Sequence, residues 1–311
     1  MSKRMDPLKP NLWNLFIFLG PTVLLLGTFL LWPIIDSFRL SLFDWNGLNV
    51  APKPVGLGNW REMSQDPHFW IGVRNGFILL VMSIGIQIPV SLSIALLLYR
   101  GGKRFRIFKF AYFFPFLMSS VAVGILFRQV FDPNFGLINS VLDALNLDKV
   151  ALDWIGDPKI AIYSVSALVC WQYIPFYILL FLAALNGVSS EIEEAAAIDG
   201  AENWKLIRLI QIPLIRGSIV TEITLMVIGS LKYFDLMWVM TGGGPEFSTS
   251  TMATYLYQVA FKSYRVGYGS TIASALFIIV FALNFFNWIK SMKQFFHNNL
   301  ARCCNFIKVI Y

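Results

Sequence analysis

The sequence predicts an all-α integral membrane protein with six transmembrane helices, and three observations lead to this fold class. Hydrophobic residues make up 57% of the 311-residue chain, charged residues make up 14%, and the mean hydropathy is +0.63. These values lie far from those of ordinary soluble domains. Six apolar runs reach the roughly 18 to 25 residues that a helix needs to cross the hydrocarbon core of a bilayer.

The predicted spans cover approximately residues 15–35, 76–99, 110–127, 160–185, 218–240 and 270–289. Basic residues precede the first span, so it could be taken for a secretory signal. Its apolar run exceeds a typical signal core and no small-residue cleavage site follows, so we expect it to remain as a helix. Pro89 and Pro175 lie inside the second and fourth spans, where we expect kinks.

The distribution of Lys and Arg predicts that both termini are cytoplasmic. With the N-terminus inside, 15 of the 25 basic residues fall on the inner side, nine fall on the outer side and Lys232 lies within a span. An inner excess of this kind sets the orientation of membrane proteins. The net charge of +7 therefore reflects topology rather than a nucleic-acid surface. Residues 1–290 are expected to form one membrane domain, followed by a weakly ordered cytoplasmic tail at 291–311.

Polar segments with turn residues separate the spans on the predicted outer side. One contains Phe-Asp-Pro-Asn-Phe-Gly at 131–136, followed by a short amphipathic helix over 137–145. Another opens with Thr-Gly-Gly-Gly-Pro at 241–245. That glycine run lacks the Gly-Lys-Ser/Thr ending of a phosphate-binding loop and is predicted on the side away from ATP, so we do not expect phosphate binding there. The three cysteines and two histidines show no metal-ligand spacing.

The inner loop at 186–217 carries the strongest functional signal. Its run from Ser190 to Glu193 matches a capping box, which predicts a helix from Ser190 through Ile198. Asp199 and then a glycine supply the stop, because glycine readily adopts the left-handed conformation that ends helices. The loop therefore begins with a short, well-delimited helix.

A second helical stretch at 202–209 leads to Pro213, so the loop is expected to form a helix-turn-helix on the cytoplasmic surface. Helical spacing puts small and apolar residues on one side of the first helix, namely Ile192, Ala195, Ala196 and Asp199. Small side chains permit close approach to a groove in another protein, and Glu194 could meet a basic residue there. The alternative is a helix lying on lipid, but its acidic residues would face anionic headgroups. Spacing alone leaves both interpretations open.

The loop resembles the cytoplasmic signature of ABC importer permeases. That signature reads Glu-Ala-Ala, three residues, Gly, nine residues and Ile-x-Leu-Pro, and the chain matches it at Glu194, Ala195, Ala196, Gly200, Ile210 and Pro213. Ile212 replaces the leucine. Stretches at 131–139, 171–176 and 234–245 look like the carbohydrate-uptake branch, which includes maltose, glycerol-3-phosphate and multiple-sugar permeases. The likeness covers about residues 12 to 290 and is greatest to the first permease subunit of such systems.

The resemblance implies a type I importer fold that pairs with a second homologous permease. It also implies two ATP-binding cassette ATPases beneath the membrane and a solute-binding protein outside. By this likeness the loop from Ser190 to Trp204, including Ile198 and Asp199, is the coupling helix that the ATPases move. The partner ATPases would bind ATP and Mg, and the chain itself would have no catalytic residue, cofactor or metal. The implied location is the cytoplasmic membrane of a bacterium or archaeon.

Polar residues inside membrane spans mark transport paths by default, because an unpaired one costs at least about 2.5 kcal/mol. Lys232 and Asp235 are three residues apart in the fifth span and could pair on one helix face. Glu222, near the inner end of that span, could reach the interface. The expected substrate path comprises Trp171, Gln172, Tyr173, Tyr177, Lys232, Tyr233, Asp235, Trp238 and Asn284. Helix packing is the alternative role for each aromatic residue.

The favoured function is the permease subunit of an ATP-driven carbohydrate importer. A permease for a non-sugar solute is the alternative. An ion-coupled secondary carrier would need relays of intramembrane acids and usually about twice as many spans. A membrane enzyme would need a paired catalytic cluster, and none is evident. The sequence identifies neither the sugar nor whether the two ATPases are identical.

Overall fold

The computed structural model describes residues 12–48, 51–101, 108–147 and 151–310. Over these ranges the chain is largely helical, with a short antiparallel ladder in which β1 (Phe43–Asp44) pairs with β2 (Lys53–Pro54). The chain divides into two compact units, which are described separately. The first comprises Met1–Gln65 and Leu256–Ala275, and the second comprises Asp66–Tyr255 and Leu276–Tyr311.

In the first unit, an apolar helical run leads into short polar elements. The run consists of α1 (Leu12–Leu26), η1 (Gly27–Leu31) and α2 (Trp32–Leu40), and α3 (Gly58–Gln65) follows the strands. Later residues add η6 (Gln258–Lys262) and the first turns of α16 (Val266–Ile310). Asn59 ties α3 to the preceding segment, because its Nδ2 donates to the carbonyls of Ser41 at 3.0 Å and Phe43 at 2.9 Å.

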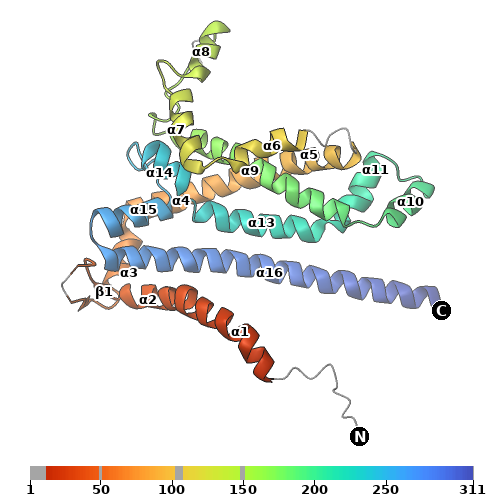
Figure 1. The fold of residues 1–311 in the computed structure, drawn as a ribbon, viewed down its shortest axis with the longest axis horizontal. Coiled ribbons are helices and arrows are strands. Elements are labelled where there is room, and N and C mark those ends of the chain that lie inside the picture. The colour runs from red at the N-terminus through yellow and green to blue at the C-terminus, as the bar shows by residue number, and fades with distance from the viewer. Residues whose placement is uncertain (1–11, 49–50, 102–107, 148–150, 311) are drawn as a thin grey trace. The chain divides into compact units, whose positions relative to one another are not determined.

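The second unit is built around α9 (Ala161–Asn186), against which α5, α6 and α13 pack (Figure 1). Before α9 come α4 (Pro67–Met82), η2 (Ser83–Gln87), α5 (Ile88–Arg100), α6 (Phe108–Leu117), α7 (Ser120–Val130) and α8 (Leu137–Ala144). After it come α10 (Ser190–Ile198), α11 (Trp204–Leu206), η5 (Ile207–Gln211), α12 (Ile212–Leu214), α13 (Arg216–Leu231), α14 (Asp235–Thr241) and most of α15 (Met252–Tyr257). Helix α9 is apolar on all sides, as expected for a helix surrounded by others. It contributes Val165 to one hydrophobic cluster and Phe181 to another.

Prolines explain three wide helical turns. The π-helical turns η1, η2 and η5 end two residues before Pro33, Pro89 and Pro213, respectively. A proline ring cannot donate to the carbonyl four residues earlier and clashes with it, so the backbone widens locally and the helix stays continuous. The predicted kink at Pro89 is therefore a π turn, whereas Pro175 lies inside α9 without ending it.

Five of the predicted spans correspond to helical runs that are long and apolar enough to cross a membrane, namely Ile17–Leu40, Pro67–Arg100, Ala161–Asn186, Arg216–Thr241 and Val266–Asn287. The second begins at Pro67 rather than near residue 76, because Asp66 caps it and its Oδ1 accepts from the amide of His68 at 2.9 Å. The segment predicted as a weakly ordered tail continues α16 as far as Ile310.

The predicted third span, 110–127, is wrong as a single helix, because α6 and α7 are separated at Met118 and Ser119. Pro115 lies near the end of α6, and Ser119 adopts an extended backbone as the N-cap of α7. Gln172 Nε2 donates to the freed carbonyl of Met118 at 3.3 Å. A break inside a membrane is tolerated when a neighbouring helix supplies such a partner.

The fifth span is also interrupted, since α13 ends at Leu231 and α14 starts at Asp235. Lys232 and Asp235 therefore do not share one continuous helix face, and no ion pair joins these two described residues. Both side chains are exposed. The predicted pairing is wrong because the chain leaves the helix between them.

Candidate functional site

Helix α10 has the predicted bounds, Ser190–Ile198, but its cap differs from the one that the capping box indicates. Its N-cap is Ser189, whose Oγ accepts from the amide of Glu191 at 3.3 Å. The predicted cap at Ser190 is therefore wrong. The side chain of Glu193 accepts a hydrogen bond from Gln211 Nε2 at 2.7 Å, instead of returning to the cap. Either bond would be charge-assisted, but the Gln211 amide is buried and would be left unpaired without this acceptor, whereas water can satisfy the exposed cap.

The predicted helix stop at Asp199 and Gly200 is confirmed. Gly200 has a φ of +77°, and the amides of Gly200 and Ala201 donate to the carbonyls of Ala197 at 3.0 Å and Ala196 at 2.8 Å. This pair of bonds is a Schellman motif, which satisfies the last carbonyls of a helix and needs a left-handed residue. A Cβ at Gly200 would meet nothing within 4 Å, so the backbone conformation alone favours glycine there.

The predicted docking face of α10 is only partly exposed. Ile192 is 44% exposed, and Ile198, which is not part of the predicted face, is 87% exposed. Ala196 is only 6% exposed, so its predicted place on the outward face is wrong. The outward surface combines acidic and apolar side chains, namely Glu194, Ala195, Ile198 and Asp199.

The second half of the loop is a continuous helical run formed by α11, η5 and α12, which is longer than the predicted 202–209. The run follows Asn203, whose φ of +48° turns the chain between the two halves. Arg100 Nη2 donates to the Asn203 carbonyl at 2.8 Å, so the end of α5 holds this turn. Ile210 lies in η5 and Pro213 lies in α12, immediately before α13.

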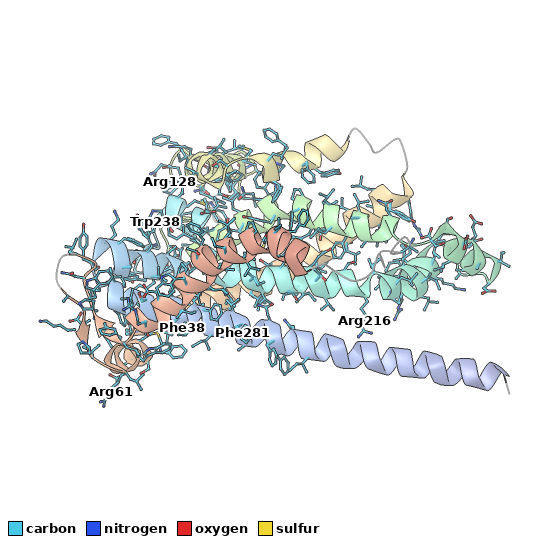
Figure 2. The ribbon with its side chains drawn as sticks, turned by 60° about the horizontal axis from the view of Figure 1, so that its bottom comes forward. Phe38, Arg61, Arg128, Arg216, Trp238 and Phe281 are labelled. Atoms are coloured by element: carbon cyan, nitrogen blue, oxygen red, sulfur yellow. The ribbon has the colours of Figure 1, made fainter. Side chains whose placement is uncertain are left out.

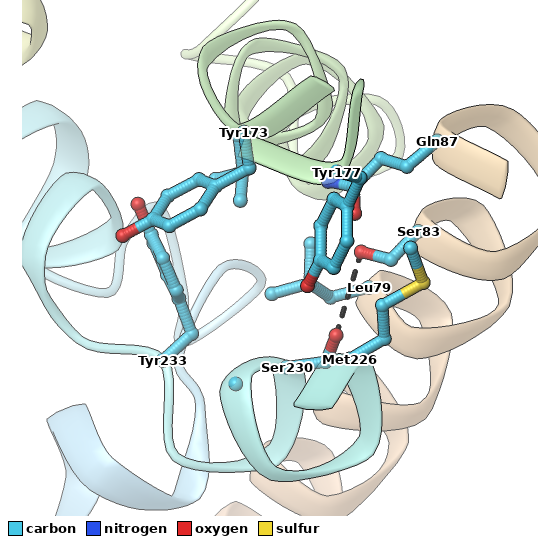
Figure 3. Close-up of a pocket in the computed structure, with 10 residues that line it drawn as sticks. Leu79, Ser83, Gln87, Tyr173, Tyr177, Met226, Ser230 and Tyr233 are labelled. Atoms are coloured by element: carbon cyan, nitrogen blue, oxygen red, sulfur yellow. Dashed lines mark hydrogen bonds between the residues drawn. The ribbon is translucent and has the colours of Figure 1, made fainter. Parts of the chain in front are cut away.

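A cavity of about 70 Å³ lies in the second unit among α4, η2, α9 and α13 (Figure 3). Its lining residues are Leu79, Ser83, Gln87, Val169, Tyr173, Tyr177, Met226, Gly229, Ser230 and Tyr233. Ser230 Oγ donates to Ser83 Oγ at 3.4 Å, which joins α13 to η2 across one wall. The π turn before Pro89 thus supplies two of the polar lining residues.

Three phenol rings dominate one side of this cavity. Tyr173 and Tyr233 meet edge to face with their ring centroids 6.1 Å apart, and their hydroxyl ends lie close together (Figure 3). Tyr177 lies one helical turn from Tyr173 on α9 and is buried. Aromatic faces next to hydroxyl and amide groups suit a polar organic solute.

Helix α8 confirms the short helix predicted at 137–145. Asn139 on this helix holds the surrounding segment together. Its Nδ2 donates to the carbonyls of Pro133 and Leu152, both at 3.0 Å, and its Oδ1 accepts from Trp154 Nε1 at 2.8 Å. Earlier in the same segment, Asp132 Oδ1 accepts from two backbone amides at 2.9 Å. The bond from the Phe135 amide, and after it the bond from the Asn134 amide, hold the pKa of the Asp132 carboxyl below its ordinary value.

Comparison with known proteins identifies the family. Residues 87–293 match the model of the family described as the binding-protein-dependent transport system inner membrane component, which is more than half of the chain. The chain belongs to this family.

Relatives of this transport component include several permease proteins. A probable ABC transporter permease protein of Pyrococcus horikoshii is 32% identical over 90% of this chain and 96% of its own length. The lactose transport system permease protein LacF of Rhizobium radiobacter is 30% identical over 90% of this chain and 95% of its own length. The multiple sugar-binding transport system permease protein MsmF of Streptococcus mutans is 31% identical over 91% of this chain and 96% of its own length. The resemblance to carbohydrate-uptake permeases is confirmed, and the chain is a transport subunit rather than an enzyme.

Among solved structures, this permease is similar to a chain of a bacterial alginate ABC transporter in complex with a periplasmic protein that binds an alginate pentasaccharide. The TM-score is 0.77 at 19% sequence identity, over 88% of this chain and 92% of that chain. A likeness at this identity concerns the fold, and it confirms the predicted type I permease fold.

Only three of the residues predicted for the substrate path of this permease line the cavity, namely Tyr173, Tyr177 and Tyr233. The others, which do not line it, are Trp171, Gln172, Lys232, Asp235, Trp238 and Asn284. Trp238 lies on α14 (Figure 2), and its ring stacks on that of Phe234 with the centroids 5.7 Å apart. Asn284 Nδ2 donates at 2.8 Å to the carbonyl of Val280 in its own helix.

Sequence reasoning missed the lining residues on η2 and α13, including Ser83, Gln87 and Ser230. A signal was present, because Ser83 and Gln87 are polar residues four apart in an apolar span, just before Pro89. Polar side chains at that spacing share one helix face and rarely face lipid.

Glu222 is buried rather than interfacial, with 1% of its side chain exposed, so the predicted reach to the interface is wrong. The reason is its place in the helix, since α13 begins at Arg216 (Figure 2). Glu222 lies almost two turns further along α13. Neither carboxyl oxygen has a hydrogen-bond partner in the described structure. Met226, one turn later on the same helix, lines the cavity.

Replacing Gln172 with Ala is expected to destabilise the permease by about 1 to 2 kcal/mol, because the carbonyl of Met118 at the α6–α7 break loses its donor. Thermal unfolding in detergent measures this loss. The exposed Gln129 on α7 is the matched control, and Gln129→Ala should leave the melting temperature unchanged. Equal melting temperatures for the Gln172 and Gln129 variants would contradict the capping role.

Proposed function

We propose that this chain is a permease subunit of an ATP-driven importer for a carbohydrate, in the sense of a sugar, an oligosaccharide or a sugar phosphate. The observation that carries the proposal is the 186–217 loop, an exposed and sharply delimited helix-turn-helix joined directly to the helix that lines the cavity. The loop would dock with a cytoplasmic ATPase, and the cavity would form part of the path. ATP and Mg would be bound by the ATPases alone.

The surface of α10 supports docking to protein rather than to lipid. Ile198 is nearly fully exposed and stands among Glu194 and Asp199, which are also exposed. An apolar residue surrounded by acids suits a groove with a basic rim, whereas acids are repelled by anionic headgroups. The excess of Lys and Arg on one side of the predicted topology supports a cytoplasmic location for this loop and both termini.

The cavity supports a carbohydrate as the solute. Tyrosine rings offer apolar faces for a sugar ring, and Ser83, Gln87 and Ser230 offer partners for its hydroxyls. Several relatives are named for the uptake of lactose, multiple sugars or diacetylchitobiose, which favours the same class. One relative is named for osmoprotective compounds, so a non-sugar solute is the alternative.

The full assembly would contain a second homologous permease, two ATPases and an extracytoplasmic solute-binding protein. Native purification in mild detergent tests this composition: an ATPase and a second permease should co-purify in fixed proportion. Reconstituted vesicles containing the complex and the binding protein should then take up labelled sugar only with internal ATP.

Two results would redirect the proposal. Uptake by the isolated chain, driven by an ion gradient, would support a secondary carrier instead. ATP-dependent uptake of osmoprotective compounds without uptake of any sugar would support the non-sugar alternative.

A further inference from the structure

The coupling loop contains an internal contact that joins three elements at a single atom. Glu193 Oε1, on α10, accepts from Gln211 Nε2 at 2.7 Å and from the Tyr99 hydroxyl at 3.3 Å. Gln211 is the last residue of η5, and Tyr99 lies in the last turn of α5. The first half of the loop is therefore bonded to its second half and to the end of the second span.

Because Gln211 is buried, its side-chain amide depends on the hydrogen bond to Glu193. The Gln211 side chain is 1% exposed, and its Oε1 has no hydrogen-bond partner in the described structure. The bond to Glu193 is thus what orients this amide. Hydrogen bonds to a carboxylate are stronger than neutral ones, and a buried amide that lost this acceptor would be left unpaired.

Neighbouring side chains on α10 face either the rest of the permease or the outside. Glu193 is half-buried and turns toward Gln211, and Ala196, one turn later, is buried on the same side. Glu194 and Ile198 are exposed and remain available to a partner. The helix thus has an outward face for docking and an inward face fixed to the permease.

Gln211 is placed to pass motion on to the cavity. The chain continues from η5 through α12 into α13, and Met226, Gly229 and Ser230 on α13 line the cavity. Packed helices move as rigid bodies, so a displacement applied at Gln211 reaches these residues. On the other side, Arg100 holds the turn at Asn203 against the end of α5.

We infer that Glu193 and Gln211 are positioning residues that transmit the displacement of α10 to α13 and so couple ATPase movement to the cavity. This inference rests on the proposed docking of α10 with an ATPase. It assigns the two residues a role distinct from docking, because neither belongs to the outward face.

The test uses the reconstituted full transporter with Gln211→Glu, Gln211→Met and the exchanged pair Glu193→Gln with Gln211→Glu. Gln211→Glu places a second carboxylate against Glu193, and Gln211→Met removes the Nε2 donor. The exchanged pair restores one amide and one carboxylate, with their positions reversed. We expect sugar uptake per ATP hydrolysed to fall about tenfold in each single variant, as for loss of one charge-assisted bond. The exchanged pair should recover most of it. Gln129→Met makes the same change at an exposed residue of α7, outside the loop and the cavity, and should match the parent.

The outcomes separate transmission from folding and from docking. A normal ratio of uptake to hydrolysis in Gln211→Met, or no recovery in the exchanged pair, overturns the inference. Loss of ATPase co-purification in Gln211→Met also overturns it, since the bond would then serve docking. Ile198→Asp tests the proposed function separately: if the ATPase still co-purifies with that variant, docking through α10 fails whatever the Gln211 variants do.

Discussion

Gly200→Val is expected to abolish ATP-coupled uptake while the permease still inserts in the membrane. Gly200 has a φ of +77°, and a β-branched residue in the left-handed region costs about 1 to 2 kcal/mol or more. The Schellman bonds from Gly200 and Ala201 would break, and the end of α10 would unwind next to the exposed Ile198. The measurement is uptake by reconstituted vesicles, together with the amount of ATPase that co-purifies.

Gly200→Asn is the matched control, because asparagine tolerates the left-handed conformation better than other residues with a side chain. A Cβ at this position meets nothing within 4 Å, so the two variants differ mainly in backbone preference. The Asn variant should keep most of the uptake. If the Val variant transports and binds ATPase as the parent does, the helix stop has no part in coupling.

Gly229→Leu is expected to reduce uptake at least tenfold while leaving the assembly and its basal ATP hydrolysis intact. Gly229 lines the cavity, and a Cβ there would meet nothing within 4 Å. The added side chain therefore fills space instead of colliding with neighbours. Replacing a glycine within a helix also favours the helix by up to about 1 kcal/mol, so misfolding is not the expected result. Uptake assays with a co-purification check measure the effect.

Gly217→Leu provides the comparison for this variant. Gly217 lies on the same helix, its Cβ would also meet open space, and it is not among the cavity-lining residues. Its variant should transport normally. Equal uptake by the two leucine variants would mean that the solute passes elsewhere.

Local signals allowed the helix stop of α10 to be predicted, because a left-handed glycine acts within its own turn. The N-cap was misplaced because Ser189 and Ser190 are both good caps. The choice between them depends on Glu193, which bonds to Gln211 eighteen residues later. Sequence spacing contains no information about that contact.

Hydropathy located the apolar spans but could not show where the backbone leaves the helix. The break at Met118 depends on the donor from Gln172, a residue in another span. The cavity was only partly predicted for a similar reason. Its tyrosines were recognised by residue type, whereas Ser83 and Gln87 take their positions from the wide turn before Pro89.

That wide turn also determines which residues at the far end of the span meet the loop. A π turn takes up one more residue than an α-helix over a similar rise, so it rotates everything beyond it by about 100° around the helix axis. Tyr99 and Arg100 lie about three turns beyond η2 and contact Glu193 and Asn203. In a straight helix these two side chains would point about a quarter-turn away from the loop. A helical wheel drawn through Pro89 therefore assigns the wrong face to the end of this span.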